Sequence, residues 1–176
     1  RKFFTMATVD RYPVTQKYLM TRNQALNFPI DFFKGNFRKN DVYGVVIDIP
    51  MPNNVLSTMV CFINGAANLY FNNGGEYTGA SQKYRTLVQA AHNLVAVSNT
   101  MLPKCEKTTQ FDLPRGRVHN VFLLTKSGVY KTEFAPGIIP EDQPEKRNVY
   151  VLYQKVLNEL RSCQLKDELA RNKGNN

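Results

Sequence analysis

Two apolar runs separated by an Asn-Gly pair constrain the fold of this chain more than any other feature. Residues 55–63 and 66–71 are rich in amino acids that favour strands, and Asn64-Gly65 lies between them. Asn-Gly is the preferred pair of a two-residue type I′ turn, because both turn positions need positive φ angles. We therefore expect an antiparallel hairpin whose register pairs Val60 with Leu69.

Both faces of this expected hairpin are apolar. One face carries Leu56, Val60, Phe62, Leu69 and Phe71, and the other carries Met59, Cys61, Ile63 and Tyr70. A sheet with one solvated face shows polar residues on that side, so something is expected to cover the second face. The cover is a helix, the N-terminal segment or a second subunit. We therefore treat Met59, Cys61, Ile63 and Tyr70 as candidate interface residues.

The remaining pattern predicts one α+β domain over residues 41–171. Further strands are expected at 42–49, 118–125 and 129–134, and helices with apolar residues at a 3.6-residue period at 81–102 and 147–170. The long central helix is expected to begin with Ser81 or Thr78 as its N-cap and to stop at Pro103. The prediction is roughly five antiparallel strands, with a basic, aromatic-rich segment 1–40 packed on the domain and a frayed tail at 172–176.

The order of these elements resembles the profilin-like group, which includes roadblock and longin domains. The resemblance rests on residues 62–71, on Gly74-Gly75, on the helix from Ser81 and on the later hairpin at 124–130. In that group a central hairpin and a glycine-bearing connection lead into the long helix of a five-stranded antiparallel sheet. The likeness covers about residues 42–165 and implies a non-catalytic module that dimerises or docks partners.

A glycine-rich turn before the central helix has the glycine spacing of a phosphate-binding loop. A Walker A loop reads Gly-x-x-x-x-Gly-Lys-Ser/Thr between a strand and a helix. Here the lysine position holds Ala80, and Glu76 adds negative charge inside the loop. Nucleotide binding is therefore not expected, and we predict no cofactor. The residues of the candidate anion-binding turn are Gly74, Gly75, Gly79 and Ser81.

The side chains that could support catalysis show no recognisable spacing. His92 and His119 are the two histidines of the chain, and nothing ties either to a nucleophile or to a set of metal ligands. Asp48 lies in an apolar strand on the same face as Val46. We expect it to pair with a cation such as Arg117 or Lys131 rather than to act as an acid catalyst. No enzyme activity, catalytic residue or metal site is predicted.

The positive charge is concentrated at the front of the chain. The net charge is +9, and residues 1–40 hold eight Lys or Arg residues against two Asp residues, a net of +6. Phenylalanines alternate with basic residues here, as in proteins that stack bases and neutralise phosphates. The candidate nucleic-acid contacts are Arg1, Lys2, Lys34, Arg38 and Lys39.

Cysteine usage and hydropathy bear on the compartment. Cys61, Cys105 and Cys163 are widely spaced and form no Cys-x-x-Cys pair, so neither a disulfide framework nor a zinc site is expected. No apolar run reaches the roughly 18 residues of a membrane span. The leading hypothesis is a cytoplasmic protein-interaction or homodimerisation module. The alternative is a nucleic-acid-binding protein that uses the basic N-terminal segment.

Overall fold

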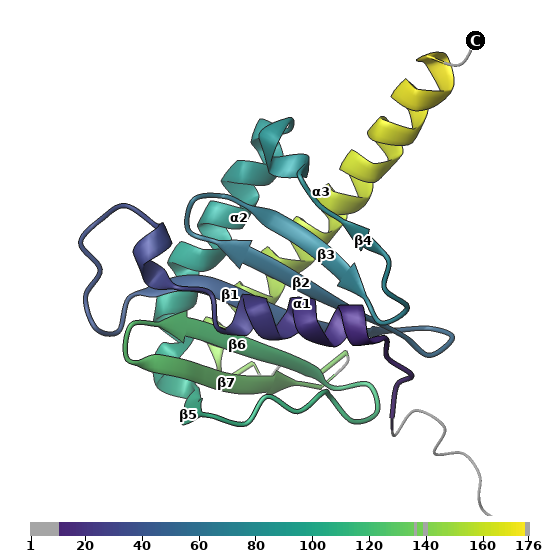
Figure 1. Ribbon diagram of the computed structural model, residues 1–176. Helices are drawn as coiled ribbons and strands as arrows, with labels where there is room; N and C mark the ends of the chain where they lie inside the picture. The colour runs from purple at the N-terminus through teal and green to yellow at the C-terminus, as the bar shows by residue number, and fades with distance from the viewer. Residues whose placement is uncertain (1–10, 136, 139–140, 175–176) are drawn as a thin grey trace, which may run out of the picture.

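A single antiparallel sheet flanked by helices forms the body of the computed structural model, which describes residues 11–135, 137–138 and 141–174 (Figure 1). The strands are β1 (Val42–Met51), β2 (Val55–Phe62), β3 (Ala67–Phe71), β4 (Glu76–Tyr77), β5 (Glu106–Thr108), β6 (His119–Thr125) and β7 (Gly128–Phe134). The helices are α1 (Gln16–Leu26), α2 (Arg85–Ser98) and α3 (Pro144–Gly174), with short 3₁₀ turns η1 (Ile30–Phe32), η2 (Ala80–Gln82) and η3 (Asn99–Lys104). The predicted α+β class is confirmed.

The expected count of five strands is wrong, because the described residues form seven. Their order in the sheet is β4-β3-β2-β1-β6-β7-β5. The two additional strands lie at the two edges, where β4 pairs with β3 and β5 pairs with β7. Each has only two or three residues, so neither shows the apolar alternation by which a strand is recognised. Short edge strands also limit edge-to-edge association.

The turn of the β2–β3 hairpin has three residues rather than the two that we expected. The amide of Phe62 donates to the carbonyl of Ala66 at 3.0 Å, and the pairing places Met59 opposite Leu69. Gly65 has a φ of +92°, whereas Asn64 is not among the described residues with positive φ. This geometry fits a turn followed by a bulge glycine. The expected register was therefore wrong by one residue, which moves the side chains of β3 to the opposite faces.

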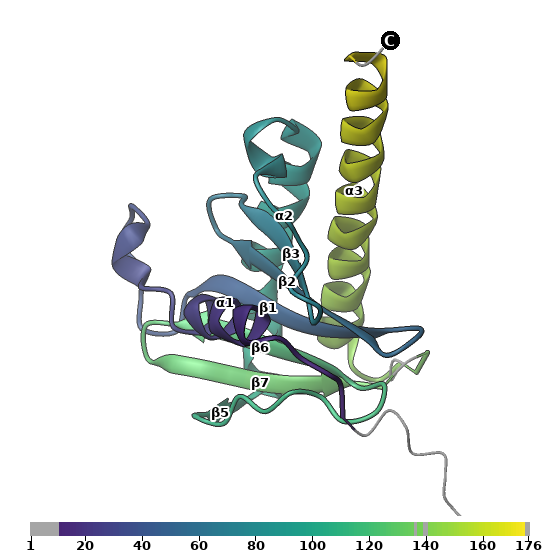
Figure 2. The same cartoon turned by 45° about the vertical axis from the view of Figure 1, so that its right-hand side comes forward.

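Helices cover both faces of the sheet, as Figures 1 and 2 show together. On one face α2 and α3 pack over a core that includes Met59, Cys61, Leu69, Leu94, Tyr153 and Leu160. On the other face α1 and the residues after it pack over Val46, Val60, Phe62 and Phe122. The central strand β1 is apolar on both sides because neither face meets water.

The candidate interface on the hairpin is largely inside the molecule. Met59 is 0% exposed and Cys61 is 1% exposed, both in the core beneath α2 and α3. Tyr70 lies on the other face and packs beneath the N-terminal segment. Ile63 is partly exposed at the turn. Met59 and Cys61 therefore contribute no exposed surface, because α2 and α3 of the same chain cover them.

The two long helices differ from their expected bounds. The segment 81–102 divides into η2, α2 and η3, and the residue at the N-cap of α2 is Tyr84. Ser81 does not cap this helix, since its hydroxyl donates to the carbonyl of Gly65 at 2.6 Å. Pro103 lies within η3 rather than ending α2. Helix α3 runs to Gly174, so residues 172–174, expected to fray, are helical.

Helix α3 extends past the sheet at its C-terminal end (Figure 2). The last anchor along it is Asp167, which accepts hydrogen bonds from Tyr77 at 2.7 Å, Lys83 at 2.8 Å and Tyr84 at 2.5 Å. These donors lower the pKa of the Asp167 carboxyl, because they stabilise its charged form.

None of the helices in the described ranges combines the length and apolarity that crossing a membrane requires.

Candidate functional site

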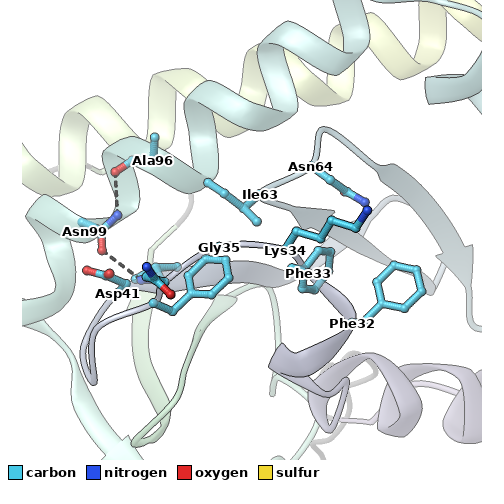
Figure 3. Close-up of a pocket in the computed structure, with 12 residues that line it drawn as sticks. Phe32, Phe33, Lys34, Gly35, Asp41, Ile63, Asn64, Ala96 and Asn99 are labelled. Carbon is cyan, nitrogen blue, oxygen red and sulfur yellow. Dashed lines mark hydrogen bonds between the residues drawn. The ribbon is translucent and has the colours of Figure 1, made fainter.

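A pocket of about 650 Å³ opens between the segment that follows α1 and the C-terminal end of α2 (Figure 3). It is lined by Phe32, Phe33, Lys34, Gly35, Asn36, Phe37, Asp41, Val42, Ile63, Asn64, Ala96 and Asn99. Three parts of the chain that are distant in sequence thus form its walls: residues 32–42, the β2–β3 turn and the last turn of α2. Most of the exposed lining is apolar, as is usual for binding pockets.

Aromatic packing fixes the first wall. The ring of Phe28 lies 4.8 Å from that of Phe62, and the ring of Phe33 lies 5.2 Å from it. The hydroxyl of Tyr43 also donates to the carbonyl of Phe28 at 2.5 Å. Phe32 packs edge-on against Phe28 and Phe33 at the outer side of this cluster, with 65% of its surface exposed. The segment is therefore held on the sheet by the buried ring of Phe33 and the half-buried ring of Phe28, while the third ring is largely exposed to solvent at the pocket.

The opposite wall is held against α2 by close contacts at the β2–β3 turn. The ring Nδ1 of His92 lies 2.7 Å from the carbonyl oxygen of Ile63. A Cβ atom on Gly65 would lie 2.4 Å from Cγ1 of Val88, so only glycine allows the turn to approach the helix this closely. These contacts position Ile63 and Asn64 at the rim of the pocket.

The polar groups at the base of the pocket are already engaged. Asn99 accepts from the amide of Val42 at 2.9 Å and donates to the carbonyl of Ala96 at 2.9 Å. Asp41 accepts from the backbone amide of Arg38 at 2.7 Å and forms an ion pair with the Arg38 guanidinium at 3.4 Å. These contacts stabilise the pocket and occupy the Asn99 amide and part of the Asp41 carboxylate.

The loop that forms the first wall of the pocket is basic. Lys34 lines the pocket, and Arg38 and Lys39 follow on the same loop. Neither Lys34 nor Lys39 takes part in an ion pair with another described residue. Arg38 does, yet its side chain is 90% exposed. The pocket therefore combines an apolar interior with a positively charged rim.

Comparison with known proteins identifies no relative of this chain. No protein-family model, no curated protein and no solved structure matches it. The chemistry of the pocket and of the side chains around it is thus the basis for a functional proposal.

The candidate anion-binding turn is not assembled in the structure. Gly74 and Gly75 belong to the turn between β3 and β4, whereas Gly79 and Ser81 lie at the start of η2. The amide of Gly74 donates to the carbonyl of Phe71, that of Gly75 to Asn73 and that of Gly79 to Asn68. Since these donors are used internally and lie in two separate turns, they do not converge on an anion.

The groups considered for catalysis are held apart by separate structural contacts. His119 lies 2.9 Å from the hydroxyl of Tyr153, and His92 contacts the β2–β3 turn. Burial raises the pKa of the Cys61 thiol to about 12, so it stays protonated at neutral pH. No group of His, Cys, Asp and Glu side chains suited to a metal ion occurs within the described ranges.

Asp48 makes the structural pair that we expected, but with a different partner. It binds Arg22 of α1 rather than Arg117 or Lys131, and it also accepts from the hydroxyl of Thr58 at 2.8 Å. The sequence did not indicate Arg22 as the partner of Asp48, because tertiary packing sets the orientation of α1 across the sheet.

Two of the five candidate nucleic-acid contacts, Arg1 and Lys2, lie outside the described residues. Of the other three, Lys34 lines the pocket, and Arg38 and Lys39 follow it on the same loop. Sequence reasoning identified this basic and aromatic loop but not the opposite wall. Nothing in the sequence connects Asn64 or Ala96 with residue 32, because that proximity depends on how α2 and the hairpin cross the sheet.

Proposed function

We propose that this protein is a non-catalytic interaction module that binds a protein partner at the pocket between η1 and α2. The exposure of Phe32 carries this proposal. Its neighbours Phe28 and Phe33 pack on the sheet, whereas Phe32 is 65% exposed beside an apolar pocket. An aromatic side chain at the edge of an apolar depression is typical of interaction surfaces, where aromatic residues are enriched and contribute much of the binding energy.

The burial and the contacts of the reactive side chains support a non-catalytic role. Asp48 is 0% exposed and bound to Arg22, and the Cys61 thiol is buried in the core. Neither faces the pocket, whose described lining contains no histidine or cysteine. The proposal therefore assigns no step of acid, base or nucleophilic chemistry to this site.

We propose that the likeness to the profilin-like group is one of architecture. Its support is the chain order of β1, β2, β3, α2, β6 and β7, which follows the expected order of five strands around a central helix. In this interpretation β4 and β5 are additions at the edges. A cytoplasmic location belongs to the same proposal and is supported by three cysteines that are free rather than paired.

Selection of peptides on the wild-type protein tests the proposal when no partner is known. A random peptide library is panned on the wild type, and the enriched peptides are then measured on Ala96→Trp, in which the new side chain fills the pocket from α2. Gln89→Trp is the matched control, since Gln89 is an exposed residue of the same helix outside the pocket lining.

We expect the enriched peptides to bind Ala96→Trp at least about tenfold more weakly than they bind the wild type, and to bind Gln89→Trp normally. Equal affinity for the two variants would place binding elsewhere on the molecule. Sedimentation of the unliganded wild type separates a foreign partner from a homodimer, the form of association that the sequence suggested first.

Single-stranded nucleic acid is the second candidate ligand, favoured by one observation. Exposed Phe32 and the basic Lys34, Arg38 and Lys39 lie on one loop, which is the combination that stacks a base and neutralises phosphates. Gel shifts with an oligothymidine across a salt series test it, because phosphate contacts weaken steeply as salt rises. Absence of a shift at low salt would remove this alternative.

A further inference from the structure

We infer that the pocket recognises an acidic segment of a partner protein, with one apolar side chain inserted and carboxylates on either side of it. This inference rests on the proposed function, since it names the chemistry of the partner that docks at the same pocket. Three features of the pocket carry it: the engaged polar groups at its base, two nitrogen donors that face each other at its mouth, and the charge around its rim.

The interior of the pocket suits an apolar side chain rather than a polar ring. Val42, Ile63 and Ala96 contribute apolar surface, and the amide of Asn99 and the carboxylate of Asp41 are already bound within the protein. A nucleobase or a sugar placed against this apolar surface would replace only part of its hydrogen bonds to water, which is costly. A leucine or phenylalanine side chain has no such loss.

Two hydrogen-bond donors at the mouth of the pocket have no acceptor among the described residues. Figure 3 shows the ammonium end of Lys34 pointing across the pocket toward the side chain of Asn64. Asn64 uses its oxygen to accept from the amide of Ala66 at 3.1 Å, and within the described residues its NH₂ group makes no hydrogen bond. An ammonium and an amide that face each other suit a carboxylate placed between them, since its oxygens accept from both.

The rim extends this preference beyond a single contact. Lys39 and Arg38 lie on the loop beside Lys34, and Lys126 lines the hollow on the outer side of the same loop. The acidic groups nearby are Asp31 and Asp41, and Asp41 is paired with Arg38. Positive charge therefore exceeds negative charge around the mouth, and it attracts acidic residues on both sides of the anchor.

The same charge argues for a separate partner rather than a second copy of this chain. Each copy carries a net charge of +9, so two copies repel each other as they approach. An acidic segment of another protein gains from the same field, both in its rate of association and in its orientation at the pocket.

The test uses the peptides enriched on the wild-type protein. We expect them to contain more Asp and Glu than the unselected library, on both sides of a Leu, Ile, Met or Phe. For one such peptide, replacement of every Glu by Gln is expected to weaken binding about tenfold in fluorescence anisotropy at low salt, and the difference is expected to shrink as salt rises.

Variants of the protein provide the reciprocal test. The double variant Lys34→Glu, Lys39→Glu is expected to bind the acidic peptide at least about tenfold more weakly than the wild type does. Its affinity for the Gln version of the peptide is expected to be nearly unchanged. Lys155→Glu, at an exposed site on α3 away from the pocket, is the control and is expected to have little effect. Circular dichroism checks that the double variant is folded, and the comparison of Glu and Gln peptides on the wild type needs no variant.

The possible failures are distinguishable. Enriched peptides that lose binding to Ala96→Trp but are neutral or basic would overturn the acidic preference and leave docking at the pocket standing. Peptides that bind Ala96→Trp as well as the wild type would overturn the proposed function itself. An oligothymidine that competes more strongly than the acidic peptide would assign the rim to nucleic acid, and self-association abolished by Lys34→Glu would assign the pocket to a second copy.

Discussion

Arg22 of α1 binds Asp48 of β1 at two points, with Nε 2.9 Å from Oδ1 and Nη2 2.7 Å from Oδ2. Both side chains are removed from water, since the Asp48 side chain is 0% exposed and that of Arg22 is 6% exposed. Burial lowers the pKa of the Arg22 guanidinium, but the charge and hydrogen bonds of Asp48 outweigh it and the pKa is raised. This pair holds α1 on the sheet, and the segment that follows α1 forms one wall of the pocket.

Removal of one partner of this pair is expected to be costly. Asp48→Ala leaves the Arg22 charge buried without compensation, so we expect a loss of about 3–5 kcal/mol in the free energy of unfolding. Glu133→Ala is the control, because it removes an acid that is 58% exposed from its pair with Lys131 and is expected to cost about 1 kcal/mol or less. Urea unfolding followed by circular dichroism measures both, and equal losses would contradict the assigned role of Asp48.

Glycine at the β2–β3 turn is expected to be required for packing as well as for conformation. Gly65 and Gly79 have φ angles of +92° and +82°, so alanine is strained at both sites. A Cβ at position 65 also meets Val88, whereas a Cβ at position 79 meets nothing within 4 Å. We expect Gly79→Ala to cost about 1–2 kcal/mol and Gly65→Ala about 2–5 kcal/mol in urea unfolding. Equal costs would show that the approach to α2 is unimportant.

The stability of the fold is expected to fall as His119 becomes protonated. Burial lowers the pKa of His119 below 6.5, so below that pH the unfolded chain binds a proton that the folded protein excludes. The contribution of this residue is therefore fully present above pH 6.5 and is lost as the pH falls toward the lowered value.

The measurement compares urea midpoints at pH 7.5 and pH 5 for the wild type and for His119→Gln. Carboxyl groups contribute equally to both proteins, so the variant is expected to show a smaller decrease across this interval. An identical decrease in the wild type and His119→Gln would refute the assignment.

Much of the fold was predictable because the long strands are apolar on both faces. Residues such as Val45, Val46 and Ile47 indicate a central strand covered on two sides, and they are at most 1% exposed. The hairpin register was not predictable from Asn64-Gly65, because the same pair serves in a three-residue turn in which glycine alone adopts the left-handed conformation. The edge strands escaped notice because main-chain pairing rather than side-chain burial forms them.

The candidate site was predictable only in part. The alternation of phenylalanine and basic residues at 32–39 indicated a binding loop, but it did not show which ring is exposed. That outcome depends on Phe28 and Phe33 occupying the space above Phe62, so that Phe32 packs against their edges and stays 65% exposed. The interface expected at Met59 and Cys61 was wrong because the covering layer is α2 and α3 of the same chain.

Titration of the ¹⁵N-labelled wild-type protein with an enriched acidic peptide tests the central claim most directly. Chemical-shift changes in heteronuclear NMR spectra report which backbone amides lie near the ligand. The account predicts the largest changes at Phe32 to Phe37, Asn64, Ala96 and Asn99, which line the pocket. Changes confined to another surface, such as the edge formed by β5 and β7, would contradict it.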